Sequence, residues 1–247
     1  MAAALSSFSP FTILHALTLA MLVAATAIAI LIGRRLRGTP GLVAFDATFA
    51  AIALVMWVVE DTQHVLVRPF DPAHALPFEV CDLEGLLLPL TFFFPRPVLR
   101  ALLYFWGIGL SSQGLFTPQL HDGPSSFHYW QFFFRHGGIV GGAIYLVNVH
   151  GYRPTWRDWR TAVLLGIAYV LVILVVDVSF GFNYGYVGNA RPDQPSLIDV
   201  LGPWPWRVGV MMALAVVVFA LLMAPWAWRS RAGRQRTAGD PRPEVTE

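Results

Sequence analysis

Residues 161–184, TAVLLGIAYVLVILVVDVSFGFNY, decide the class of fold. The segment carries one charged residue, Asp177, in its second half. A helix rises about 1.5 Å per residue, so roughly 20 apolar residues cross a hydrocarbon layer of about 30 Å. The segment therefore predicts a transmembrane helix.

The rest of the chain has a similar character. Of its 247 residues, 56% are hydrophobic and 13% are charged, whereas a soluble domain has about 25% charged residues. A fold of this length in water would need more polar side chains to cover its surface. The composition therefore indicates a multi-pass protein of the cell membrane. The net charge of +2 gives no reason to expect a nucleic-acid partner, and no soluble protein partner is indicated.

Apolar runs predict an all-α, polytopic fold with seven transmembrane helices. The third run is the least apolar because it holds Glu79, Asp82 and Glu84. The predicted spans are Phe11–Ile32, Leu42–Val65, Phe78–Phe94, Val98–Thr117, Trp130–Val149, Thr161–Tyr184 and Trp204–Trp228.

The arginines predict the orientation of these spans, because basic residues concentrate on the cytoplasmic side of a membrane. With the N-terminus outside, 13 of the 17 basic residues fall inside and 4 fall outside. An odd number of spans then gives a cytoplasmic C-terminus. We expect a transmembrane domain over residues 1–228 and a disordered cytoplasmic tail over 229–247, which is rich in Arg, Gly, Pro and Glu.

The absence of lysine and the presence of a single cysteine limit the reaction mechanisms that the protein can use. All 17 basic residues are arginines, so no lysine can form a Schiff base or act as a nucleophile. Cys81 is the only cysteine, which excludes an internal disulfide and a cysteine-rich metal site. We therefore expect chemistry that needs no cofactor.

Polar residues gather toward the predicted outer ends of the spans, and the inner halves are almost purely apolar. Ionisable groups at membrane depth are costly and usually face a cavity or one another. The sequence therefore predicts one polar pocket, open to the outer leaflet or the outer water. Its candidate members are Glu60, Asp61, His64, Cys81, Asp82, Glu84, Gln113, Arg135, His136, Asp177, Asn183 and Tyr184.

Helical periodicity indicates which of these side chains share a face. Trp57, Glu60 and His64 share one face of the second span, and Cys81 lies near Gly85 on the third. On the fifth span, the pairs Gly137/Gly141 and Gly138/Gly142 lie away from the face that carries His136. Small residues four apart favour close helix packing. These glycines could pack within the chain or form a homodimer.

Cys81 and His136 are the sharpest candidate pair, because a thiolate can attack an acyl carbonyl while an imidazole takes up and returns the proton. Asp82 or Glu84 could orient the imidazole, and Gln113 or Asn183 could donate to an oxyanion. The alternative is a small buried cysteine that serves packing and an unrelated histidine. Glu60, His64 and Tyr184 complete the candidate supporting or substrate-binding residues.

Two further interpretations stay open. Glu60, His64, His121, His128 and Asp82 suggest a metal site, but no H-x-x-x-H pair occurs on one helix and we predict no metal. Glu60 and Asp177, both within predicted spans, suggest a proton or cation path, as in transporters.

Four blocks of sequence together resemble the YwaF-like family of bacterial integral membrane proteins, over roughly residues 15 to 228. They are LPFEVCDL at 76–83, GLFTPQL at 114–120, FFFRHG at 132–137, and FNY at 182–184 followed by LGPWPW at 201–206. That family is similar to the transmembrane-protein-164 group, which includes a phospholipid acyltransferase with a cysteine and a histidine. More remotely it resembles the androgen-induced hydrolases of fatty acid esters.

The resemblance implies that Cys81 is the catalytic cysteine and His136 the catalytic histidine. One departure is Glu79, which stands where the family commonly has a histidine two residues before the cysteine. The leading hypothesis is a membrane-embedded acyltransferase or ester hydrolase that acts on phospholipids or other lipid esters through a thioester. The alternative is a lipid-binding or small-molecule-binding membrane protein, or a transporter, without covalent chemistry.

Overall fold

The computed structural model describes residues 6–66, 69–189 and 197–238. Within those residues the fold is helical and contains no β-strand, which confirms the all-α prediction. The main helices are α2 (Ile13–Arg35), α3 (Pro40–Leu66), α5 (Val80–Phe93), α6 (Pro97–Gly109), α8 (Phe127–Asn148), α9 (Trp156–Phe180) and α10 (Trp206–Ala238). The shorter elements are α4 (Pro72–Ala75), α7 (Ser112–Phe116), and the 3-10 turns η1 (Tyr184–Tyr186) and η2 (Leu197–Leu201).

Four of the described helices are long and apolar enough to cross a membrane: α2, α3, α9, and α10 over Trp206–Trp228. Their outward side chains are largely apolar; on α9, for example, Val172 and Val175 are 63% and 66% exposed. Side chains of this kind suit a lipid environment. The protein is therefore a helical membrane protein, and the count of seven spans and their orientation stay predictions.

The predicted fourth span is interrupted, so the expectation of one continuous helix over Val98–Thr117 is wrong. Helix α6 ends at Gly109 and α7 begins at Ser112. At the break, the backbone N–H groups of Leu110 and Ser111 both donate to the carbonyl of Trp106, at 2.6 and 3.2 Å. Two glycines in the last turn of α6 weaken its helix propensity, and the Ser111 side chain is bonded to another helix.

The C-terminal helix extends beyond the predicted membrane boundary at residue 228. Helix α10 continues to Ala238, so the chain is helical where we expected a disordered tail to begin. Alanine and arginine are good helix formers, and a helix that is already nucleated propagates readily through them. The remaining part of the predicted tail, 239–247, lies outside the described residues.

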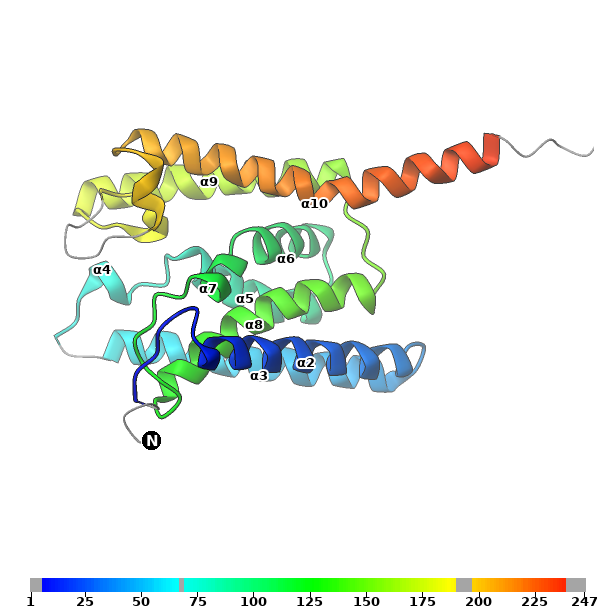
Figure 1. Ribbon diagram of the computed structural model, residues 1–247, viewed down its shortest axis with the longest axis horizontal. Coiled ribbons are helices and arrows are strands. Elements are labelled where there is room, and N and C mark those ends of the chain that lie inside the picture. Colours follow the sequence, from blue (N-terminus) through cyan, green and yellow to red (C-terminus); the bar gives the residue numbers. More distant parts are fainter. Residues whose placement is uncertain (1–5, 67–68, 190–196, 239–247) are drawn as a thin grey trace, which may run out of the picture.

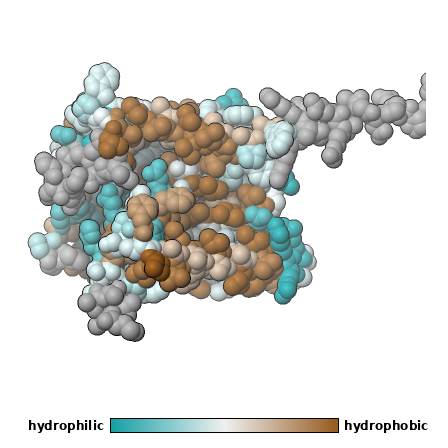
Figure 2. All heavy atoms as spheres, in the orientation of Figure 1, coloured by the Kyte–Doolittle hydropathy of each residue, from teal (hydrophilic) through white to brown (hydrophobic). Residues whose placement is uncertain are grey.

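The helices form a bundle in which short helices lie between long ones (Figure 1). Helices α9 and α10 run side by side, and α2 and α3 lie on the opposite side of the bundle. Helices α5, α6 and α8 fill the space between them, with α5 packed on α3 and α6 packed on both α8 and α9. Figure 2 shows apolar residues over the middle of the bundle and polar residues toward its ends.

The bundle has two ends, which we name by their residues. The Cys81 end holds the start of α5 and α8 and the end of α3 and α9. The arginine-rich end holds Arg34 and Arg37, which donate to the C-terminus of α8 at Asn148 and Val149.

Helix α8 packs closely because of its glycines. A Cβ atom on Gly142 would lie 2.5 Å from Leu88 Cδ1 on α5, and one on Gly141 would lie 2.6 Å from Thr26 Oγ1 on α2. The predicted glycine faces are therefore covered by helices of the same chain. The homodimer stays a prediction that does not draw on these glycines.

Candidate functional site

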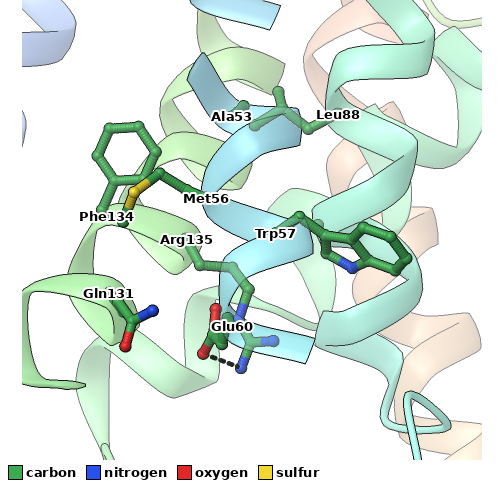
Figure 3. Close-up of a pocket in the computed structure, with 9 residues that line it drawn as sticks. Ala53, Met56, Trp57, Glu60, Leu88, Gln131, Phe134 and Arg135 are labelled. Atoms are coloured by element: carbon green, nitrogen blue, oxygen red, sulfur yellow. Dashed lines mark ion pairs between the residues drawn. The ribbon is translucent and has the colours of Figure 1, made fainter. Parts of the chain in front are cut away.

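Arg135 on α8 is the centre of a buried ionic network at the Cys81 end. Its Nη1 atom lies 2.6 Å from Asp82 Oδ1 on α5, and its Nη2 atom lies 3.2 Å from Glu60 Oε1 on α3. The Arg135 side chain is 12% exposed, and those of Asp82 and Glu60 are 9% and 4% exposed. Figure 3 shows the guanidinium and the Glu60 carboxylate turned toward one another. One permanent cation thus joins three helices.

Asp82 also stabilises the first turn of α5. Its Oδ2 atom accepts a hydrogen bond from the Glu79 backbone N–H at 3.1 Å, in a capping-box arrangement. The backbone carbonyl of Asp82 accepts a bond of 2.9 Å from Trp57 Nε1 on α3. Asp82 therefore holds Arg135 and the start of α5, and no hydrogen bond joins it to the His136 imidazole among the described residues.

The Asp82–Arg135 pair sets the relative height of the two predicted catalytic residues. Asp82 directly follows Cys81, and Arg135 directly precedes His136. The ion pair therefore holds Cys81 and His136 at a similar level of two packed helices. Cys81 is partly exposed.

His136 is buried, with 4% of its surface exposed. Its Nδ1 atom lies 2.9 Å from the carbonyl oxygen of Phe132, and its ring packs on the Phe132 ring with centroids 4.2 Å apart. Across the described residues, no hydrogen bond joins the His136 ring to Cys81. The Asp82–Arg135 ion pair thus joins the neighbours of the predicted pair, and no hydrogen bond joins the pair itself among the described residues.

The hydrogen bond to Phe132 also determines which ring nitrogen of His136 can act as a base. A carbonyl oxygen only accepts, so Nδ1 carries the hydrogen and Nε2 of the neutral ring carries the lone pair. The Nε2 side of the ring lies against Gly114 of α7, where an added Cβ would lie 2.6 Å from Nε2. The short α7 segment therefore covers the nitrogen that could accept a proton.

Glu84, one turn after Cys81 on α5, is fully buried. Its Oε2 atom accepts a hydrogen bond from the Ser111 hydroxyl at the break between α6 and α7. Glu84 is therefore directed at this break, and we find no hydrogen bond from it to the His136 ring among the described residues.

A second cluster ties the loop after α9 to the start of α5. Glu79 Oε2 accepts a bond of 2.9 Å from the backbone N–H of Gly185, and Asp177 Oδ1 accepts one of 3.0 Å from that of Tyr184. The Tyr184 hydroxyl contacts the backbone of Leu76 and Pro72. Tyr184, and Asn183 directly before it, thus belong to this loop cluster.

Two other predicted residues lie at the edge of the site. Gln113 on α7 is exposed. His64 lines an open groove of about 560 Å³ with Gln63, Leu66, His128 and Gln131. This groove lies between the ends of α3 and α8.

A small cavity lies beside Arg135 (Figure 3). Its volume is about 10 Å³, which holds about one water molecule. Gln131 lines both the cavity and the open groove. The full cavity lining is Ala53, Met56, Trp57, Glu60, Gly85, Leu88, Gln131, Phe134 and Arg135. A lipid ester would need the helices around this cavity to move apart.

The expectation that the other ends of the spans are almost purely apolar is wrong. At the arginine-rich end, buried Asp46 on α3 accepts a bond of 2.7 Å from the Tyr145 hydroxyl on α8. His150 Nε2 lies 2.9 Å from the second oxygen of Asp46. Among the described residues, no three His, Cys, Asp or Glu side chains form a group that could hold a metal ion.

Sequence reasoning missed the roles of Arg135 and Ser111. Arg135 was placed among the members of the polar pocket without an ion-pair partner, although its place in a span beside His136 was a signal for a buried ion pair. Ser111 lies between two short apolar stretches, and its partner Glu84 is 27 residues away. Nothing in the local sequence indicates that contact.

The fold and this site define a helical membrane protein with a buried charged network at one end of the bundle. Within this class, the chain belongs to the TMEM164 family, whose model matches residues 7–223. The predicted resemblance to the transmembrane-protein-164 group is thus confirmed, and those to YwaF-like proteins and to ester hydrolases stay predictions. No curated protein and no solved structure matches the chain.

Proposed function

We propose that the protein is a membrane-embedded acyl-transfer enzyme that acts on phospholipids or other lipid esters. Cys81 is the nucleophile and His136 the general base and acid. Membership of the TMEM164 family supports a membrane function. The observation that carries the proposal is the 2.6 Å Asp82–Arg135 ion pair, which joins the neighbours of Cys81 and His136.

The reaction proceeds in two steps. His136 Nε2 takes the proton from the Cys81 thiol as the sulfur attacks the ester carbonyl. The thioester forms, the ester C–O bond breaks, and His136 returns the proton to the departing alcohol oxygen. Water then gives a free fatty acid, or a second lipid hydroxyl gives a new ester, and Cys81 regains its proton.

The route of the substrate to the site depends on how far Cys81 and His136 are covered by other residues. Cys81 is partly exposed as a residue, whereas Gly114 of α7 lies on His136. We infer that α7 moves aside when the ester enters, so that the imidazole reaches the thiol.

The proposed topology has seven membrane segments, with the N-terminus outside and the C-terminus in the cytoplasm. In this topology α6 and α7 together form the fourth segment, and α5 forms the third. The 14 residues of α5 rise about 21 Å, which is less than the thickness of the hydrocarbon layer. The chain segments directly before and after α5 therefore cross the rest of the layer. The site then lies in the outer half of the bilayer.

The test is intact-mass analysis of the purified chain after incubation with a panel of phospholipids. The enzyme forms an acyl adduct that hydroxylamine removes. The adduct is absent in Cys81→Ser, and His136→Ala lowers its rate of formation at least tenfold. His128→Ala is the matched control, because His128 is an exposed histidine paired with Asp122, and it keeps the wild-type rate. If folded wild-type protein forms no adduct and turns over no lipid in the panel, the proposal is wrong.

A second candidate is a binding protein or transporter without covalent chemistry. The break between α6 and α7 favours it, because transporters often bind their substrates at interrupted helices. This candidate predicts saturable lipid or solute binding that survives Cys81→Ser, with no adduct in any variant.

A further inference from the structure

A buried carboxyl group of α5, that of Glu84, faces the break between α6 and α7. Glu84 has 0% of its surface exposed. The Ser111 hydroxyl donates to its Oε2 atom. Its Oε1 atom is buried, and no hydrogen-bond partner for it exists among the described residues.

The charged and titratable groups around Glu84 are engaged elsewhere. On α8, Arg135 is held by Asp82 and Glu60, and His136 faces Gly114. The acidic groups near Glu84 supply no positive charge. They are Glu60 and Asp61 on α3, and Cys81 and Asp82 on α5.

The third neighbour, α6, offers no cation at this level either. Its one charged residue is Arg100, in its first turn and thus toward the other end of the helix. Tyr104 of α6 donates its hydroxyl hydrogen to Leu222 on α10. An ionised carboxylate in such surroundings is costly, and a buried acid without a cation takes up a proton instead.

The break also leaves a backbone carbonyl without its helical donor. Because Ser111 N–H donates to Trp106, the carbonyl of Gly107 lacks its usual helical donor. Interrupted helices at membrane depth commonly present carbonyls of this kind to a bound cation or proton.

We propose that Glu84 and Ser111 form a proton-binding site at the break between α6 and α7, where Glu84 is a neutral carboxylic acid. The proton lies on Oε1, and Oε2 is the carbonyl oxygen that accepts from the Ser111 hydroxyl. When the proton leaves, the carboxylate is no longer stable in the closed bundle, and the break opens.

The site is linked to His136 through α7. Ser111 directly precedes α7, and its carbonyl accepts a bond of 3.1 Å from the N–H of Gly114, the residue that covers the imidazole. Opening of the break therefore uncovers His136. This last step rests on the proposed function, whereas the proton site does not.

The experiment is infrared spectroscopy of the full chain in lipid nanodiscs, in H₂O and in D₂O. The protonated carboxyl group of Glu84 gives a C=O stretching band at neutral pH that shifts in D₂O. Glu84→Gln removes the band, and Asp122→Asn, a change at an exposed acid, keeps it. If wild type and Glu84→Gln have the same carboxyl spectrum at neutral pH, the proton site is wrong.

Ser111→Ala tests the partner in the same samples. Loss of the hydroxyl moves the band to higher frequency and raises hydrogen exchange of residues 112–117 several-fold, while α9 keeps its protection. An unchanged band position contradicts the hydrogen bond from Ser111 to the carbonyl oxygen of protonated Glu84. Because neither readout uses turnover, an inactive protein with the expected band contradicts the proposed function and leaves the proton site standing.

Discussion

The two ends of the α3–α8 contact use different chemistry for the same task. At the Cys81 end, Glu60 of α3 meets the permanent cation Arg135 of α8, which also holds Asp82. At the arginine-rich end, Asp46 of α3 meets a tyrosine hydroxyl of α8 and a histidine that follows it. Each end ties the same two helices together through a buried acid.

The difference lies in what happens when one partner is lost. At the Cys81 end, removal of the cation leaves two buried carboxylates without compensation, which is strongly destabilising. At the arginine-rich end, Tyr145 and His150 are donors that need no net charge, and the His150 side chain is 24% exposed. The ion-paired contact at the Cys81 end is therefore costly to disrupt. The contact at the arginine-rich end is an ordinary hydrogen-bonded one.

The largest effect is expected from Arg135→Met. This change keeps an unbranched side chain but leaves Glu60 and Asp82 unpaired, so we expect a loss of about 3–5 kcal/mol in the free energy of unfolding. Denaturant unfolding in mixed micelles measures it. Arg153→Met is the control, since Arg153 is exposed and lies over Trp226 at 5.1 Å, and it costs about 1 kcal/mol or less. Equal losses in the free energy of unfolding for both variants would show that Arg135 contributes no more to stability than an exposed arginine.

We expect an intermediate loss of stability from Gly142→Ala, a change on α8 between the two ends of the contact. The new Cβ would lie 2.5 Å from Leu88 Cδ1, and overpacking of this kind costs about 1–3 kcal/mol. Gly138→Ala is matched to it, because there the Cβ would lie 3.5 Å from Leu88 Cδ2, an ordinary contact. The same unfolding assay should show a loss for the first variant only. A similar loss at Gly138 would mean that helix flexibility, rather than the Leu88 contact, decides the outcome.

The parts that could be predicted from sequence depend on local patterns. Long apolar runs gave the four long helices, because hydropathy over some 20 residues is a property of one segment. Periodicity also gave the shared face of Trp57 and Glu60 and the packing role of the α8 glycines.

The parts that escaped prediction depend on contacts between distant segments. Asp46 was overlooked because its partners, Tyr145 and His150, lie about 100 residues away. The break before Ser111 was missed because hydropathy does not distinguish one long helix from two short ones. The similar height of Cys81 and His136 could be expected from depth, but the rotation of His136 toward Gly114 depends on the packing of α7.

The smallest effect is expected from Asp46→Asn at the arginine-rich end. The amide oxygen can still accept from the Tyr145 hydroxyl, so mainly the His150 contact weakens, and a loss of about 1 kcal/mol follows. Asp82→Asn at the other end is the matched change: it removes the charge that faces Arg135, and we expect about 1.5–3 kcal/mol. Both are measured by the same unfolding assay. If Asp46→Asn lowers the free energy of unfolding as much as Asp82→Asn does, then His150 is a full cationic partner of Asp46. The two ends of the contact would then both be held by ion pairs.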